Sequence, residues 1–190
     1  MFTDTTGWIT GQYFAETAYT FRDSGYTYEQ YDCIAFVNLV RTTAGVPTLA
    51  HGTNTLWRDP DDLYYKDTYN NAIARFGHLP QGCLLFRIKS EDDPTYNDPP
   101  IPPQYYMDGI GNVTHVGIYT NLGLGVMQSG GYGGSGVHQS TLRTDYFNYV
   151  ALPVYCLYPE YPIMTLNTFL ALVAGTKRKD VKRNVKRFIF

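Results

Sequence analysis

Residues 32–44 read DCIAFVNLVRTTA, and this stretch decides how the rest of the chain is interpreted. Asp32 is a preferred residue type for a helix N-cap, and apolar residues near helical spacing follow it. Gly45 and then Pro47 stop the pattern, as residues of these types do after a helix. The stretch therefore predicts a helix that begins at Cys33.

The position of Cys33 in the first turn of this helix makes it a candidate nucleophile. A thiol is reactive as the thiolate, and both a helix N-terminus and a nearby imidazole favour that form. A cysteine on an apolar segment can also be a small buried hydrophobic residue. The motif HVGIY at residues 115–119 supplies a histidine far downstream, which favours the interpretation of Cys33 as a nucleophile.

The remaining patterns place helices first and strands afterwards. A helix is expected over residues 10–21, a polar loop over 51–62 and a further helix over 63–76. Strands are expected over 83–86, 113–120, 123–128 and 149–158. Pro153 predicts that the last strand lies at a sheet edge or contains a bulge. This order predicts an α+β fold, with N-terminal helices packed on a small antiparallel β-sheet.

We expect one domain over residues 1–163 and an apolar helix with a basic tail over 164–190. Within the domain, residues 89–112 form a long segment that is rich in proline and acidic residues. Because it directly precedes the strand of His115, it is either a lid that affects specificity or a surface decoration.

Four motifs together resemble the NlpC-like family of cell-wall cysteine peptidases, over roughly residues 20–158. They are the Asp32-Cys33 pair that opens a helix, LPQG at 79–82, HVGIY at 115–119 and GVMQ at 125–128. The resemblance implies a papain-like core. It also implies that Cys33 is the nucleophile, His115 the general base and Gln128 the polar residue that orients the imidazole.

The sequence departs from the family pattern beside the cysteine. Ile34 and Ala35 follow it where the family usually has Ser and Gly, which predicts a bulkier and drier cleft floor. The tyrosine that precedes the cysteine in many members has three candidates here, Tyr26, Tyr28 and Tyr31. These departures concern the substrate more than the reaction.

Three residues are candidates for the group that orients His115. Gln128 lies on the strand after that of His115, across a tight turn, so the two side chains can face each other. Ser129 is the next residue and points to the opposite face, so only one of the two can serve. His138 is the third candidate.

The substrate-binding residues that we expect are Tyr31, Asp32 and Tyr132. The first two precede the nucleophile, and Tyr132 belongs to the glycine-rich segment 131–136 that borders the cleft. This segment matches the GxGxxG pattern formally, but no helical pattern follows it, so it predicts a flexible loop and no dinucleotide site.

The other cysteines, Cys83 and Cys156, lie in apolar runs and are expected in the core. No CxxC pair and no zinc-ligand spacing occur, so neither a metal nor another cofactor is predicted. No apolar run is long enough for a membrane span. No basic residue precedes Arg22, so we expect no secretory signal peptide, synthesis in the bacterial cytoplasm and action at the cell wall.

Charge is unevenly distributed along the chain. The overall net charge is −2, but seven of the 15 basic residues lie within 177–187, and the chain before residue 176 is acidic. The tail is therefore a candidate for contacts with an acidic protein or a polyanion, without sequence-specific recognition of nucleic acid.

These features together predict a peptidoglycan hydrolase that cleaves an amide bond of the stem peptide by a Cys–His thiolate mechanism. We expect a phage lysin or a wall-degrading component of a virion tail. Two alternatives stay open. One is another Cys–His amidase, such as the related CHAP type, or an acyltransferase. The other is an inactive structural component of a virion that keeps the scaffold.

Overall fold

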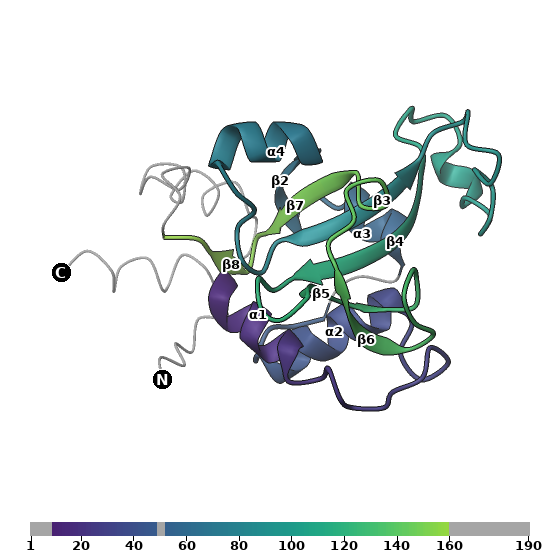
Figure 1. The fold of residues 1–190 in the computed structure, drawn as a ribbon. Helices are drawn as coiled ribbons and strands as arrows, with labels where there is room; N and C mark the ends of the chain where they lie inside the picture. The colour runs from purple at the N-terminus through teal and green to yellow at the C-terminus, as the bar shows by residue number, and fades with distance from the viewer. Residues whose placement is uncertain (1–8, 49–51, 160–190) are drawn as a thin grey trace.

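The computed structural model describes residues 9–48 and 52–159 (Figure 1). The helices are α1 (Gly11–Tyr19), α2 (Cys33–Thr43), α3 (Thr53–Arg58) and α4 (Tyr69–Phe76), with a 3₁₀ turn η1 (Pro103–Tyr105). The strands are β1 (Ile9–Thr10), β2 (Leu63–Thr68), β3 (Leu84–Lys89), β4 (Asn112–Tyr119), β5 (Gly125–Ser129), β6 (Val137–Thr141), β7 (Tyr149–Pro153) and β8 (Cys156–Leu157).

A six-stranded antiparallel sheet in the order β2-β7-β3-β4-β5-β6 forms the scaffold. Strands β3 to β6 follow one another as a meander, and β7 returns to the other side of β3. Strands β1 and β8 pair in parallel as a separate small sheet. Helices α1, α2 and α3 contact β4, whereas α4 packs on β2 and β7 (Figure 1). The α+β class is confirmed.

Capping side chains start the two N-terminal helices where the sequence predicts them. The Thr10 side chain accepts a hydrogen bond from the main-chain N–H of Tyr13 and begins α1. Asp32 Oδ1 accepts from the N–H of Ala35 at 2.8 Å and begins α2 at Cys33. A cap of this kind stabilises a helix by about 1 kcal/mol.

Three expectations about secondary structure are wrong. Residues 51–62 include α3, because Leu56 and Trp57 are buried and tertiary packing supports a short helix in a polar stretch. Residues 63–76 are β2 followed by α4, because the aromatic and apolar side chains of LYYKDT pair with β7 and Thr68 caps the helix. The single strand expected over 149–158 is divided into β7 and β8, which belong to different sheets. Pro153 ends β7, and the register of β2 and β7 shifts beside it, between Leu63 and Tyr65, so the expected edge or bulge is a bulge.

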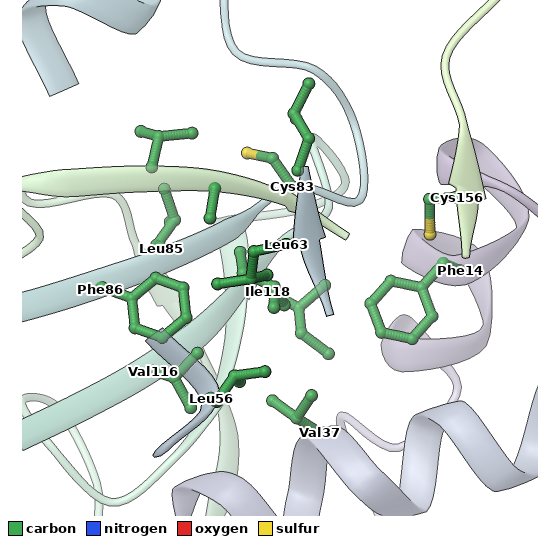
Figure 2. Packing of buried hydrophobic residues seen from close by; sticks show 14 of the residues in the cluster. Phe14, Val37, Leu56, Leu63, Cys83, Leu85, Phe86, Val116, Ile118 and Cys156 are labelled. Carbon is green, nitrogen blue, oxygen red and sulfur yellow. The ribbon is translucent and has the colours of Figure 1, made fainter. Parts of the chain in front are cut away.

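The core lies between the N-terminal helices and the sheet (Figure 2). Phe14 and Val37 from α1 and α2 belong to the same buried cluster as Val116 and Ile118 from β4, and all four are fully buried. Each such side chain stabilises the fold by about 1.5–3 kcal/mol through removal of apolar surface from water. The core positions of Cys83 and Cys156 are confirmed, since both are fully buried.

The segment 89–112, which we call the projecting segment, extends beyond the ends of β3 and β4 (Figure 1). The ammonium group of Lys89 donates to the carbonyl oxygens of Thr95 and Asp98. Arg58 at the end of α3 forms an ion pair with Asp108 and donates to the carbonyl oxygen of Gly111. The hydrogen bonds that hold the segment therefore run to α3 and to its own strand ends.

Candidate active site

Cys33 is the first residue of α2, and its thiol lies against β4. The main-chain N–H groups of Val116, the residue after His115, and of Ile34 lie near the thiol and lower its pKa, against the larger effect of burial. The packing of α2 on β4 brings these groups together. Residues separated by about eighty positions in the sequence thus place a thiol beside the strand that carries the candidate base.

His115 is held in one orientation by Gln128. The distance from His115 Nε2 to Gln128 Oε1 is 2.8 Å, and the two side chains are 4% and 0% exposed. In the register of β4 and β5, Gln128 lies opposite Gly117, so the pair is diagonal across the two strands. Because Gln128 occupies Nε2, Nδ1 is the ring nitrogen that can exchange a proton with a thiol.

A β-bulge precedes His115. Arg87 pairs with His115, but the next residue of β3, Ile88, pairs with Val113, which leaves Thr114 as an extra residue in β4. Bulges bend a strand and redirect the neighbouring side chains, and they are frequent next to active sites. The apolar pattern of β4 gave no sign of this irregularity.

The two other candidates for orienting His115 have different partners. The hydroxyl group of Ser129 donates to the carbonyl oxygen of Tyr31 and so joins β5 to the segment before α2. The ring nitrogens of His138 lie 2.7 Å from the carbonyl oxygen of Gly136 and 3.0 Å from that of Tyr132. Among the three, Gln128 is the residue whose side chain contacts the imidazole.

Aromatic residues that the sequence patterns did not single out surround His115. The ring of Phe147 stacks on the imidazole at 5.9 Å, and the ring of Tyr146 meets it edge-on at 5.7 Å. The charge of Cys33 also affects the pKa of Tyr146, so Tyr146 lies near both the thiol and the imidazole. Arg87 stacks on the Tyr146 ring at 4.6 Å and closes this side of the site.

Of the three tyrosines before the cysteine, Tyr28 is the one in contact with it. Its hydroxyl group lies near the Cys33 thiol, and burial, followed by the charges of Cys33 and Asp32, raises the pKa of Tyr28 to about 12. The residue is 42% exposed, so it lies between the thiol and the surface. The rings of Tyr26 and Tyr31 pack on each other at 4.8 Å.

The thiol and the imidazole are both uncharged at neutral pH. Burial and then the negative charge of Asp32 raise the pKa of Cys33 to about 11, while the N–H of Val116 acts in the opposite direction. Burial lowers the pKa of His115 to about 4, although the bond to Gln128 raises it. Burial of Cys33 therefore opposes the thiolate form that a helix N-terminus favours, and the expected thiolate stays a prediction.

The residues expected to bind substrate have structural contacts of their own. Asp32 caps α2, and the main chain of Tyr31 accepts a hydrogen bond from Ser129. Tyr132 packs edge-on against Tyr146 at 4.7 Å, and its hydroxyl group donates to the carbonyl oxygen of Thr141. These contacts do not test a role in substrate binding, so the substrate-binding roles of the three residues stay predictions.

The main chain of the glycine-rich segment covers the pair of His115 and Gln128. A Cβ atom added at Gly131 would lie 2.8 Å from His115 Nε2 and 2.9 Å from Gln128 Oε1. A Cβ atom at Gly130, the residue directly before the segment, would lie 2.5 Å from the ring of Tyr28. Both glycines have positive φ, so a side chain is excluded by conformation as well as by space.

A scan against models of known families, a search of curated proteins and a search of solved structures each found no match to this chain. Within residues 9–48 and 52–159, no helix is long and apolar enough to cross a membrane. The same residues contain no group of three or more His, Cys, Asp or Glu side chains that could hold a metal ion.

Proposed function

We propose that the protein is a peptidoglycan hydrolase that cleaves an amide bond of the cell-wall stem peptide, with Cys33 as nucleophile and His115 as general base. The observation that carries the proposal is the hydrogen bond between His115 Nε2 and Gln128 Oε1, because His115 lies on β4, the strand against which the helix of Cys33 packs. A nucleophile, a base and a group that orients the base is the arrangement that amide hydrolysis needs. A papain-like core is part of the same proposal.

In the proposed reaction, Cys33 Sγ attacks the amide carbonyl carbon while His115 Nδ1 takes the thiol proton. The carbonyl oxygen becomes an oxyanion, for which the N–H of Cys33 and the hydroxyl group of Tyr28 are donors close to the thiol. The carbon–nitrogen bond then breaks, and the imidazolium returns the proton to the leaving amine. Water, deprotonated by His115, hydrolyses the thioester and regenerates the thiol.

The pKa values define how the proton moves. His115, with its pKa near 4, is an unprotonated base at neutral pH, and Cys33, with its pKa near 11, is a thiol. These pKa values favour a proton transfer that accompanies the attack over a preformed thiolate–imidazolium pair. The reaction requires neutral His115, so kcat/KM falls as the pH drops through about 4 and not as it drops through the usual histidine range.

The proposed substrate class rests on the resemblance and on the residues around the thiol. Tyr28, Tyr132 and Tyr146 provide aromatic surface with hydroxyl groups, which suits a peptide substrate. The proposed setting is a phage, in which the protein is a released lysin or a component of the virion tail. Immunodetection in purified virions and in the lysate supernatant distinguishes these two settings.

Digestion of purified peptidoglycan tests the proposed activity. We expect the full chain to release fragments with new amine termini, and mass spectrometry of these fragments identifies the bond that is cut. Cleavage between glycan and peptide would assign the protein to the other kind of Cys–His amidase. C33A is expected to lose activity by at least roughly a thousandfold, whereas C156A, which removes a core thiol, keeps it.

One observation favours a second candidate, an inactive structural component. The thiol and the imidazole are both buried and uncharged, which also describes a cysteine and a histidine that only pack. On this alternative, the folded wild-type protein releases no fragments from any peptidoglycan tested, and C33A has the properties of the wild type.

A further inference from the structure

Two arginine side chains stack on the tyrosine rings beside His115. The guanidinium carbon of Arg87 lies 4.6 Å from the centre of the Tyr146 ring, and that of Arg143 lies 5.2 Å from the centre of the Tyr132 ring. The two tyrosine rings meet edge-on, and Tyr146 also contacts the imidazole of His115. Both positive charges therefore belong to the aromatic cluster that borders the candidate active site.

Arg143 already has an anionic partner in the chain. Its Nε donates to Asp145 Oδ1 at 3.1 Å, and its Nη2 donates to Oδ2 of the same carboxylate. Two parallel hydrogen bonds of this kind are the strongest way for a guanidinium to bind a carboxylate. The charge of Arg143 is therefore paired without a ligand.

Arg87 has no such bidentate partner among the residues that the structure describes. Its ion pair is with Asp93, whose Oδ2 lies 3.8 Å from Arg87 Nη2, beyond hydrogen-bond distance. Asp93 Oδ1 instead accepts hydrogen bonds from the main-chain N–H and the hydroxyl group of Thr95. A guanidinium has five N–H donors, and the side chain of Arg87 is 32% exposed, so donors remain for a further acceptor.

The position of Arg87 relates it to the candidate site. Arg87 on β3 pairs directly with His115 on β4, so both side chains lie on the same face of the sheet. Their shared contact with Tyr146 places the guanidinium within about 10 Å of the imidazole, a distance that an extended peptide covers in about three residues. One substrate molecule can therefore reach both Arg87 and the amide bond at Cys33.

We propose that Arg87 is a specificity-determining residue, which binds a carboxylate of the substrate within about three residues of the bond that is cleaved. The inference rests on the proposed function and narrows its substrate to an acidic peptide. Stem peptides carry free carboxylates, which match the planar donors of a guanidinium. The ring of Tyr146 supports the guanidinium by stacking, so binding a carboxylate orders little additional side chain.

Two forms of one soluble stem peptide test the inference by cleavage. One form has its free carboxylates, and in the other they are converted to carboxamides of nearly the same size. We expect kcat/KM of the wild type to be roughly tenfold to a hundredfold higher for the carboxylate form, as for hydrogen bonds to a charged group. R87Q should lose this preference. R143Q, which removes the other stacked guanidinium, should keep it because Arg143 is already paired with Asp145.

Binding to the C33A variant, which has no nucleophile, tests the same inference without cleavage. By isothermal titration calorimetry, C33A should bind the carboxylate form at least roughly tenfold more tightly than the carboxamide form. C33A that also carries R87Q should bind both forms equally. If R87Q does not fold, R87M, which keeps an apolar side chain against Tyr146, takes its place with the same expectation.

The outcomes distinguish the inference from the proposed function. Equal binding of the two forms by C33A, no binding of either form, or a carboxylate preference that survives loss of Arg87 overturns the inference. Cleavage of both forms at equal rates by the wild type overturns the inference and supports the proposed function. A carboxylate preference in binding that depends on Arg87, in a wild type that cleaves neither form, supports the inference and contradicts the proposed function.

Discussion

The glycine-rich segment and the projecting segment are both irregular connections between neighbouring strands, yet they are built in opposite ways. Gly131 brings bare main chain against the pair of His115 and Gln128, and Gly130, directly before the segment, does so against Tyr28. The projecting segment is held by charged side chains, chiefly Arg58 and Lys89, that reach its carbonyl and carboxylate groups. Main chain that approaches the candidate site closely must lack Cβ atoms. A segment that extends away from the fold must instead be held by side-chain hydrogen bonds and ion pairs.

This contrast divides the expected effects of substitution. Changes in the glycine-rich segment or beneath it alter the groups that we assign to catalysis. Changes in the projecting segment alter stability alone. Acid titration and substitutions in both segments test this division, and the largest change in the free energy of unfolding is expected at low pH.

Protonation of His115 at low pH should destabilise the fold more than any substitution in the projecting segment does. The folded-state pKa of His115, about 4, lies below its ordinary value of 6.5, so the unfolded chain binds the proton first as the pH falls. Stability is therefore lost as the pH falls from about 6.5 to 4, by roughly 3 kcal/mol. Urea unfolding of wild type and H115Q at pH 7 and pH 4 measures this. An equal loss in both proteins contradicts the burial of a neutral imidazole.

Alanine substitutions at two glycines compare the segments directly. Gly131 and Gly109 both have positive φ, so each substitution costs about 1–2 kcal/mol in backbone strain. The Cβ atom at Gly131 also displaces His115, whereas that at Gly109 meets no atom within 4 Å. We expect G131A to reduce amide cleavage roughly a hundredfold and G109A to leave it unchanged. Similar activities in the two variants would remove the distinction between the segments.

Removal of the main anchor should release the projecting segment and leave the site intact. R58A breaks the ion pair with Asp108, the bond to the carbonyl oxygen of Gly111 and the stacking on Tyr105. We expect a loss of about 2 kcal/mol in the free energy of unfolding with an unchanged pH profile of cleavage. Hydrogen exchange should increase in residues 103–111. A changed profile would indicate that the segment acts on the site, as a lid does.

The smallest effect is expected at the tip of the projecting segment. Met107 is 95% exposed, so M107S should change the free energy of unfolding by less than about 0.5 kcal/mol. Cleavage of soluble stem peptide should also stay the same. A large change in thermal stability would show that Met107 packs against something in solution.

The sequence predicts elements whose local signals agree with their packing. The cap and the apolar spacing of α2 place Cys33 correctly, and the alternation of β4 and β5 is enough to bring His115 and Gln128 face to face. In contrast, α3 and β2 were assigned wrongly because burial of Trp57 and pairing with β7 override weak local preferences.

The remaining features of the site depend on contacts that no local pattern encodes. The bulge at Thr114 arises from the pairing of β4 with β3, and the sequence analysis does not predict β6 because the glycine-rich stretch before it conceals the strand pattern. The choice of Tyr28 among three tyrosines needs the path of the chain before α2. The protonation of Cys33 depends on how deeply it is buried, which the sequence does not state.

The central claim is that His115 activates Cys33, and alkylation of Cys33 by iodoacetamide across a range of pH tests it most directly. If His115 takes the thiol proton, the rate rises as the pH passes through about 4, stays level through neutrality and is strongly reduced in H115A. A rate that rises only toward pH 11, and that is the same in wild type and H115A, would identify Cys33 as a buried structural thiol and contradict the account.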